Sequence, residues 1–197
     1  VPVAGALRKY QERGFTTSQL ADLLDLVRDD RRHAQRTEPK LDLVWTGPAP
    51  EKFTDRDAAV VVMDLFQSVE RSLILTSYVI FNGSDLFAPL HRRMVEVPDL
   101  VVRLFIDLPR PQGDTRAAAA IVSEFKEDFR HKHWPWDLLP EVYFDPRSLS
   151  TDKATQATLH AKVVVADEHT TLITSANLTP RAQNKNIEAG VRITSPA

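Results

Sequence analysis

Apolar residues recur along this chain with two spacings, one typical of helices and one typical of strands. A helix is predicted over residues 15–36, with Thr17 or Ser18 as its N-cap. Its apolar face consists of residues at helical spacing: Leu20, Leu23, Leu24 and Val27. We expect residues 1–40 to form an N-terminal helical segment that docks on the rest of the chain. Binding of a partner or of DNA by this segment stays open.

From Leu41 onward, short apolar runs alternate with segments of helical period. Strands are predicted at residues 41–45, 73–81, 100–108 and 141–144. Helices are predicted after a capping box of Thr54 and Asp57, over residues 86–97, and from Asp114 or Thr115 to about His133. Such alternation predicts an α/β layered domain over residues 41–197, with a mostly buried mixed sheet flanked by helices on both faces. Residues 145–159 lack a hydrophobic period and are predicted to form a polar loop.

The last third of the chain gathers polar residues around three predicted strands. If the segment from His160 is a strand, His160 and Lys162 share one face, while Ala161, Val163 and Val165 enter the core. A reversal at residues 167–169 would return the chain as a strand through residues 171–173, placing Ser175 and Asn177 beside the first pair. A third strand over residues 187–193 would carry Glu188 on its polar face, with room left at Gly190.

Composition narrows the class of protein. With 197 residues, 43% of them hydrophobic, the chain can bury one substantial core. No run approaches the roughly 18 to 20 apolar residues that span a bilayer, so we expect a cytoplasmic protein with no membrane contact. The absence of cysteine excludes disulfides and thiolate catalysis. A net charge of −2 argues against coating DNA as a polycation, so any nucleic-acid affinity must come from a local groove or from pairing of subunits.

The motif at the C-terminal end resembles the signature of the phospholipase D superfamily. The resemblance rests on His160-x-Lys162, Asp167, Ser175-x-Asn177 and Glu188, and covers roughly residues 159 to 193. One position departs from the pattern, since Thr174 stands where that family usually has glycine. Chain length and the N-terminal helical segment are similar to those of a phospholipase D-like component of a bacterial anti-phage defence system. The resemblance implies that no metal and no cofactor is used.

These residue types suit the cleavage of a phosphodiester. Neutral His160 can attack phosphorus through a ring nitrogen and form a phosphohistidine, which splits one difficult displacement into two steps. Lys162, Ser175 and Asn177 can bind the nonbridging oxygens where charge is greatest. Glu188 can accept the proton of the other imidazole nitrogen and so select the tautomer. The catalytic candidates are therefore His160, Lys162, Asn177 and Glu188, and Lys162, Ser175 and Asn177 are the substrate-binding candidates.

The resemblance also implies a second histidine, because the family uses two across one active site. This chain has a single His-x-Lys motif, so we predict a homodimer that brings two copies of His160 together at a twofold axis. Asp167 is expected to be mainly structural, as its turn position already explains a carboxylate. Tyr78, at the end of a predicted strand, either lines the cleft or packs, and both alternatives stay open.

The predicted function is a metal-independent phosphodiesterase, a nuclease that cleaves DNA or RNA, with DNA favoured over RNA, in anti-phage defence together with other defence-system proteins. Two alternatives stay open. One is a catalytically silent subunit that binds nucleic acid or helps a defence complex to assemble. The other is a phospholipid phosphodiesterase. The sequence does not decide between them, nor does it indicate strand polarity or base preference.

Overall fold

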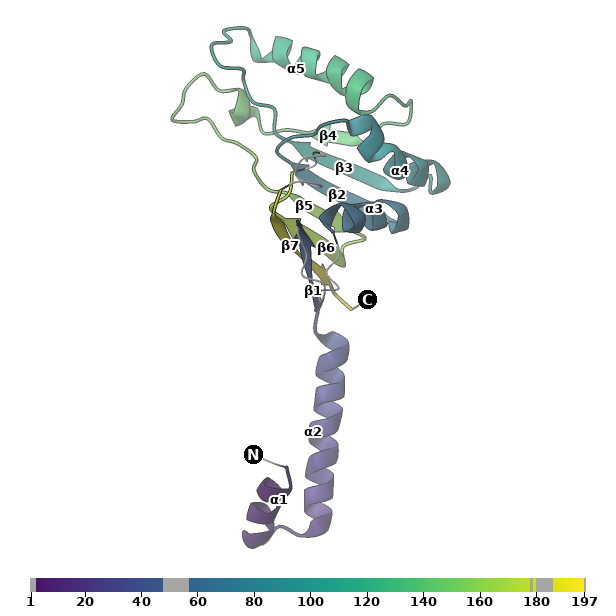
Figure 1. Ribbon diagram of the computed structural model, residues 1–197, viewed down its shortest axis with the longest axis vertical. Coiled ribbons are helices and arrows are strands. Elements are labelled where there is room, and N and C mark those ends of the chain that lie inside the picture. The colour runs from purple at the N-terminus through teal and green to yellow at the C-terminus, as the bar shows by residue number, and fades with distance from the viewer. Residues whose placement is uncertain (1–2, 48–56, 178, 180–185, 197) are drawn as a thin grey trace. The chain divides into compact units, whose positions relative to one another are not determined.

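The computed structural model describes residues 3–47, 57–177, 179 and 186–196, with the backbone alone at residues 3 and 34–36. The chain divides into two compact units, and Figure 1 labels their elements. One unit runs to Pro39 and includes the residues from Ser195 onward, and the other is Lys40–Thr194. No helix within the described residues is long and apolar enough to cross a membrane.

The N-terminal unit contains two helices, α1 (Val3–Glu12) and α2 (Thr17–Thr37). The predicted N-cap of α2 was wrong by one residue, because Thr16 fills that position. The backbone N–H of Gln19 donates to Thr16 Oγ1 at 3.2 Å, and the N–H of Thr16 donates to Gln19 Oε1 at 2.9 Å. This reciprocal pair is a capping box and fixes the start of α2. Helix α1 was not predicted, and Tyr10 and Phe15 make an edge-on ring contact beside the turn.

The second unit is built on one seven-stranded mixed sheet, which confirms the α/β class. Its strands lie in the order β1-β7-β6-β5-β2-β3-β4 (Figure 1). The strands are β1 (Lys40–Thr46), β2 (Ser72–Ser77), β3 (Val101–Ile106), β4 (Glu141–Tyr143), β5 (Val163–Ala166), β6 (Thr170–Thr174) and β7 (Glu188–Thr194). Strands β2, β3 and β4 are parallel, whereas β5, β6, β7 and β1 pair antiparallel in succession from β2.

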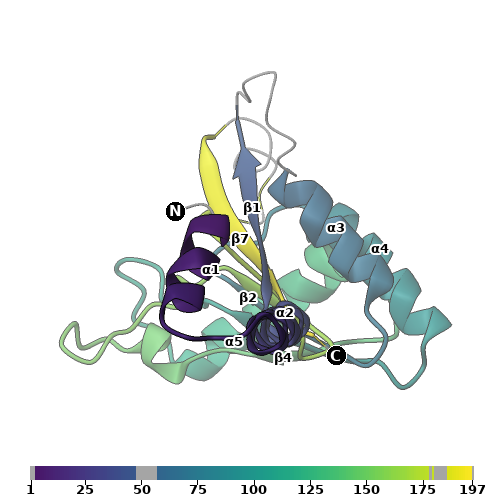
Figure 2. The same ribbon diagram turned by 90° about the horizontal axis from the view of Figure 1, so that it is seen from below.

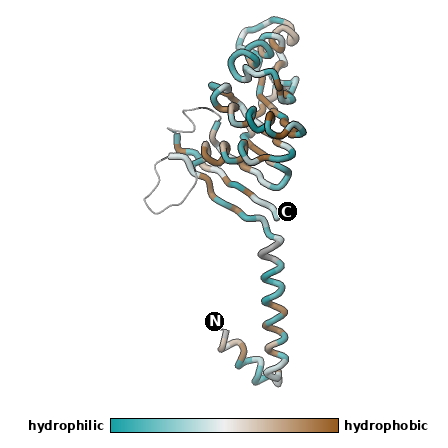
Figure 3. Tube along the Cα trace, turned by 90° about the vertical axis from the view of Figure 1, so that its right-hand side faces the viewer, coloured by the Kyte–Doolittle hydropathy of each residue, from teal (hydrophilic) through white to brown (hydrophobic). Residues whose placement is uncertain are grey.

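Helices cover one face of this sheet. They are α3 (Ala58–Ser68), α4 (Gly83–Glu96), α5 (Ala118–Asp128) and a π-helical turn (Phe129–His133), and a 3-10 turn (Pro146–Leu149) lies further along the chain. Figure 2 shows α3 and α4 together on the same side of the strands. The hydrophobic stretches of the sheet and of α3 are visible in Figure 3. Burial of this face supplies most of the core, which includes Phe66, Leu73, Leu75, Phe87, Leu90 and Leu104.

The opposite face of the sheet is half exposed within the described part of this unit. Ile74, Tyr143 and Ile173 are 36%, 44% and 45% exposed, whereas Leu73, Leu75 and Leu172 on the other face are fully buried. The expected helices therefore cover one face of the sheet rather than both. The described helices of Lys40–Thr194 pack on the other face, where leucine and phenylalanine side chains form the core.

Several predicted boundaries were wrong for local reasons. The strand expected to reach residue 81 ends at Ser77. Helix α5 begins at Ala118 with no side-chain cap, because Asp114 is bonded to Arg116 instead. Helix α3 is capped by Asp57, whose carboxylate accepts the N–H of Ala59 at 2.9 Å. Thr54 lies outside the described residues.

The strand predicted from His160 starts three residues later and has the opposite orientation. Lys162, Val164 and Ala166 are buried at 7%, 4% and 4% exposure, whereas Ala161 is exposed and Val163 and Val165 lie on the half-exposed face. The expectation that Ala161, Val163 and Val165 enter the core was therefore wrong. A shift of one position along a strand exchanges its two faces, so Lys162 points into the protein.

Candidate active site

His160 lies just before β5, in a segment with no regular secondary structure. The backbone on each side of it is bonded to side chains. The N–H of Leu159 donates to Asp107 Oδ1 at 2.9 Å, and Thr76 Oγ1 donates to the carbonyl of Ala161 at 3.1 Å. The side chain of His160 is exposed, and its ring packs against Tyr78 with 4.8 Å between the centroids. An exposed imidazole next to an aromatic wall is accessible to a substrate.

Lys162 brings a buried ammonium group against this imidazole. Its Nζ lies 3.0 Å from His160 Nδ1, 3.2 Å from Nε2 and 2.7 Å from the carbonyl oxygen of His160. The same Nζ lies 5.6 Å from the centre of the Tyr78 ring, within the range of a cation–π contact. Burial lowers the pKa of Lys162, and the nearby Glu188 carboxylate opposes this shift. The predicted pair of His160 and Lys162 is thus brought together.

Strands β6 and β7 place the remaining candidates next to Lys162. The N–H of Thr174 donates to the Lys162 carbonyl at 3.1 Å, and the N–H of Ser175 donates to the carbonyl of Ala189 at 3.0 Å. Ser175 Oγ donates a short hydrogen bond to Glu188 Oε2 and accepts the N–H of Ala189 at 3.1 Å. Ser175 and Glu188 therefore form one hydrogen-bonded pair at the ends of β6 and β7.

Asn177 follows this pair and is half-buried. Its Oδ1 is shielded from solvent and has no hydrogen-bond partner among the described residues. Buried amide oxygens are nearly always bonded, so an unpartnered one is the kind of group that a ligand or water satisfies. No contact joins Asn177 to His160 or Lys162 within the described residues, so its part in the site stays a prediction.

Glu188 is placed near the site but is bonded differently from expectation. Besides Ser175, its carboxylate accepts the side-chain N–H of Asn186 at 3.0 Å. No hydrogen bond joins it to His160 within the described residues, so its action on the His160 tautomer stays a prediction. The space expected at Gly190 is filled by the neighbouring strand, because an added Cβ would lie 2.6 Å from the carbonyl oxygen of Ile173.

Asp167 is a structural anchor in the turn between β5 and β6. Its carboxylate accepts three backbone N–H groups, from Glu70 at 2.9 Å, Arg71 at 2.6 Å and Ser72 at 3.0 Å. Burial alone would raise the pKa of Asp167, but these three donors together hold it below its usual value. This carboxylate fixes the start of β2 against the turn, which agrees with the structural role expected for it.

The other histidines do not join the group. His133 Nδ1 accepts the N–H of Gly83 at 3.3 Å, and burial lowers the pKa of this imidazole. His169 Nδ1 lies 2.9 Å from the carbonyl oxygen of Asp167. Within the part of the chain that the structure describes, no second histidine contacts His160. One copy of the chain therefore presents a single imidazole at this site.

Three residues that contact the His160 segment were not assigned to the site from the sequence. Tyr78 was left open between two roles, and it lies against both His160 and Lys162. Asp107 and Thr76 were not singled out at all. Asp107 is a charged residue directly after the apolar run of β3, which is the one signal that pointed to it.

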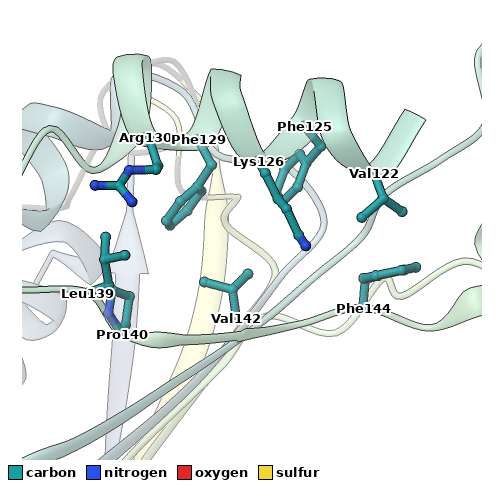
Figure 4. A pocket seen from close by; sticks show the side chains of 9 residues that line it. All are labelled: Val122, Phe125, Lys126, Phe129, Arg130, Leu139, Pro140, Val142 and Phe144. Carbon is teal, nitrogen blue, oxygen red and sulfur yellow. The ribbon is translucent and has the colours of Figure 1, made fainter. Parts of the chain in front are cut away.

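An apolar hollow lies elsewhere in the described part of the structure. It has a volume of about 290 Å³ and lies between α5 and the strand region of β4, as Figure 4 shows. Phe125, Phe129, Val142 and Phe144 are among its lining residues, and Lys126 extends into it. None of the candidate catalytic residues lines this hollow, so the site rests on the polar group around His160.

Comparisons with known proteins match the C-terminal part of the chain to one family model. The family described as cardiolipin synthase, PLD-like domain, matches residues 137–197, which include all six motif positions. The DISARM protein DrmC of Bacillus paralicheniformis is 24% identical over 160 residues, which make up 81% of this chain and 59% of that protein. The chain therefore spans about three-fifths of the length of this curated relative.

Three solved structures have chains similar to this one. Nuc of Salmonella typhimurium, a phospholipase D family member, is 24% identical with a TM-score of 0.47, covering 80% of this chain and 84% of that chain. NucT from Helicobacter pylori is 15% identical with a TM-score of 0.48, covering 80% and 86%. Phosphatidylserine synthase of Haemophilus influenzae is 17% identical with a TM-score of 0.46, covering 80% and 35%.

Proposed function

We propose that this chain is a metal-independent phosphodiesterase that cleaves nucleic acid through a phosphohistidine on His160, a proposal supported by the match of residues 137–197 to a PLD-like domain. The contact between the Lys162 ammonium and the His160 ring carries this proposal, because it pairs a nucleophile with a buried cation within 3.2 Å. A phosphate anion next to His160 would lie close to the ammonium group of Lys162, whose pKa is lowered by burial.

The chemistry proceeds in two balanced steps. An imidazole nitrogen of His160 forms a bond to phosphorus while the bond from phosphorus to the leaving oxygen breaks, and that oxygen takes a proton from an acid. Water then attacks phosphorus, the bond to nitrogen breaks, and the water proton goes to the group that acted as acid. Lys162 and Asn177 bind the nonbridging oxygens in both steps, with Ser175 as a further donor.

The acid comes from a second copy of the chain in this proposal. One copy offers only one imidazole at the site, and the exposed position of His160 leaves it accessible to a partner. A twofold axis near His160 would place two such rings across one cleft, so that one attacks while the other protonates the leaving oxygen. Light scattering coupled to size-exclusion chromatography should therefore give a dimer, and a strictly monomeric active enzyme would contradict this part of the proposal.

Nucleic acid is the substrate class that we favour, with DNA ahead of RNA. The similarity to DrmC supports a place in anti-phage defence with other proteins of such a system. Because the chain has a net charge of −2, binding should depend on the few local cations of the site, and its affinity should fall only gradually as the salt concentration rises. We place this activity in the cytoplasm, where such DNA would be met.

An activity screen in EDTA tests the proposal. Single-stranded DNA, duplex DNA, RNA and phospholipid vesicles are incubated with the protein, its His160→Ala variant and a matched His131→Ala control on an exposed histidine. We expect EDTA-resistant cleavage of nucleic acid by the wild type and by His131→Ala, and none by His160→Ala. Cleavage of phospholipid alone would overturn the substrate class, and nucleic-acid binding without turnover would favour a silent binding subunit.

A further inference from the structure

The segment that holds His160 has few backbone contacts of its own. Strand β5 begins only at Val163, and the polar loop before it contributes no strand. A side chain from β2 and one from the end of β3 bond the peptide groups on either side of His160 instead. Irregular segments are mobile unless such bonds fix them, so these two side chains decide how firmly the imidazole is placed.

We propose that Asp107 and Thr76 are positioning residues that clamp the peptide groups on both sides of His160 and so hold its imidazole in line for attack. The clamp consists of Asp107 Oδ1 with the N–H of Leu159 and of Thr76 Oγ1 with the carbonyl of Ala161. This inference rests on the proposed function, because it assigns a purpose to the placement of His160.

Thr76 does more than fill its position in the sheet. Its hydroxyl donates to the carbonyl of Ala161 at 3.1 Å and accepts the N–H of Val163 at 3.0 Å, opposite which it lies in the β2–β5 ladder. One side chain thus satisfies two backbone groups where the regular ladder ends. A valine has nearly the same shape but no hydroxyl, so it would leave both groups without this partner.

Packing alone does not explain a buried aspartate at position 107, because burying a carboxyl group lowers stability. Its side chain is only 6% exposed, and Oδ2 is shielded from solvent with no partner among the described residues. Burial raises the pKa of Asp107, while the N–H of Leu159 and the nearby His160 both act to lower it. A buried carboxyl with one unbonded oxygen costs stability, and such costs are typical of functional positions.

A purely structural role makes different predictions from the clamp. If the two contacts only stabilise the fold, their loss lowers the unfolding midpoint and leaves turnover per folded molecule unchanged. If they position His160, their loss lowers kcat in fully folded protein, because a displacement of about 1 Å in a reacting group can cost about 100-fold in rate. KM should change little, since Lys162 and Asn177 stay in place to bind phosphate.

The experiment compares Thr76→Val with Thr76→Ser and with Thr171→Val, a control threonine in the neighbouring strand β6. In EDTA, at a temperature where each variant is folded, we expect kcat to fall by about 10- to 100-fold in Thr76→Val with KM within about three-fold. Thr76→Ser should restore kcat to within about three-fold, and Thr171→Val should match the wild type. Unchanged kcat in folded Thr76→Val would overturn the clamp.

Asp107 is tested in parallel with a readout that needs no turnover. Amide hydrogen exchange of Leu159, followed by NMR, should quicken at least about ten-fold in Asp107→Ala and stay near the wild-type rate in Asp107→Asn, which keeps an acceptor oxygen. If Asp107→Ala does not fold, exchange of the Val163 amide in Thr76→Val supplies the same test, because that N–H donates to Thr76 Oγ1. If the wild type shows no turnover, the proposed function fails, whereas unchanged exchange at Leu159 would overturn the clamp by itself.

Discussion

Replacement of Asp167 separates a structural carboxylate from a catalytic one. The carboxylate accepts the N–H groups of Glu70, Arg71 and Ser72, so Asp167→Ala removes the partner of three backbone donors. Hydrogen bonds to a charged group are worth about 1.5–3 kcal/mol when shielded, and the partial exposure of these reduces each to roughly 1 kcal/mol. Asp167 also has a φ of 54°, where alanine adds a strain of roughly 1 kcal/mol.

We therefore expect Asp167→Ala to lower the free energy of unfolding by about 4 kcal/mol. Asp167→Asn tolerates the same φ and keeps one acceptor oxygen, so its loss should be about 2 kcal/mol. Urea unfolding followed by circular dichroism measures both values. Each kcal/mol corresponds to a fall in Tm of about 2–4 °C for a chain of this size, so scanning calorimetry gives an independent check.

The dependence on pH has a definite sign. The folded-state pKa of Asp167 is lowered, so its contribution to stability is present in full above its unfolded pKa of about 3.9 and is lost as the pH falls through the folded value. The difference between wild type and Asp167→Asn should thus be largest at neutral pH and shrink in acid. A loss below about 1 kcal/mol in Asp167→Ala, or kcat reduced over 100-fold in folded Asp167→Asn, would refute the structural role.

Two further predictions concern the same site. Lys162→Met keeps the length of the side chain but removes the buried ammonium group, whose pKa is lowered by burial. We expect the activity to fall at least about 100-fold, while the midpoint of urea unfolding stays level or rises. A loss of stability above about 1 kcal/mol would contradict this. Gly190→Ala would place a Cβ 2.6 Å from the carbonyl oxygen of Ile173. The free energy of unfolding should therefore fall by about 2 kcal/mol or more, and the activity should fall because Ser175 is displaced. Unchanged unfolding curves would contradict the close approach of β6 and β7.

The sequence predicted most strands of the sheet and helices α3 and α4. Apolar residues recur with the strand period in the strands and with the helical period in the helices. Strand β1 and helix α3 are examples, with Val44 buried in the strand and Val61, Val62, Leu65 and Phe66 buried in the helix. The α/β class and the antiparallel run of three strands at the C-terminal end followed from the same signal. Helix α1 was not predicted, although Val3, Leu7 and Tyr10 stand at helical spacing within its ten residues.

The orientation of β5 could not be read from its residues. Its run of three valines and an alanine offers an apolar residue to either face, so the alternation is ambiguous by one position. The buried face is the one with Lys162, and a charged residue is a poor sequence signal for burial. The motif placed His160 and Lys162 together correctly, but not the direction in which Lys162 points.

The contacts around His160 could not be predicted from the sequence for a different reason. Asp107 and Leu159 are 52 positions apart, and Thr76 and Ala161 are 85 apart, so only the fold brings them together. The bond of Glu188 to Ser175 likewise depends on how the ends of β6 and β7 meet. Motif spacing identifies the reacting groups, whereas tertiary structure determines which side chains hold them.

The most direct test of the account is to trap the covalent intermediate. Wild-type protein is mixed with a short DNA substrate in EDTA, quenched in alkali to preserve the acid-labile bond between nitrogen and phosphorus, and digested for peptide mass spectrometry. We predict a nucleotide adduct on the peptide that contains His160, absent from His160→Ala and present from His131→Ala. Turnover with an adduct on another residue, or continued cleavage by His160→Ala, would contradict the central claim that His160 is the nucleophile.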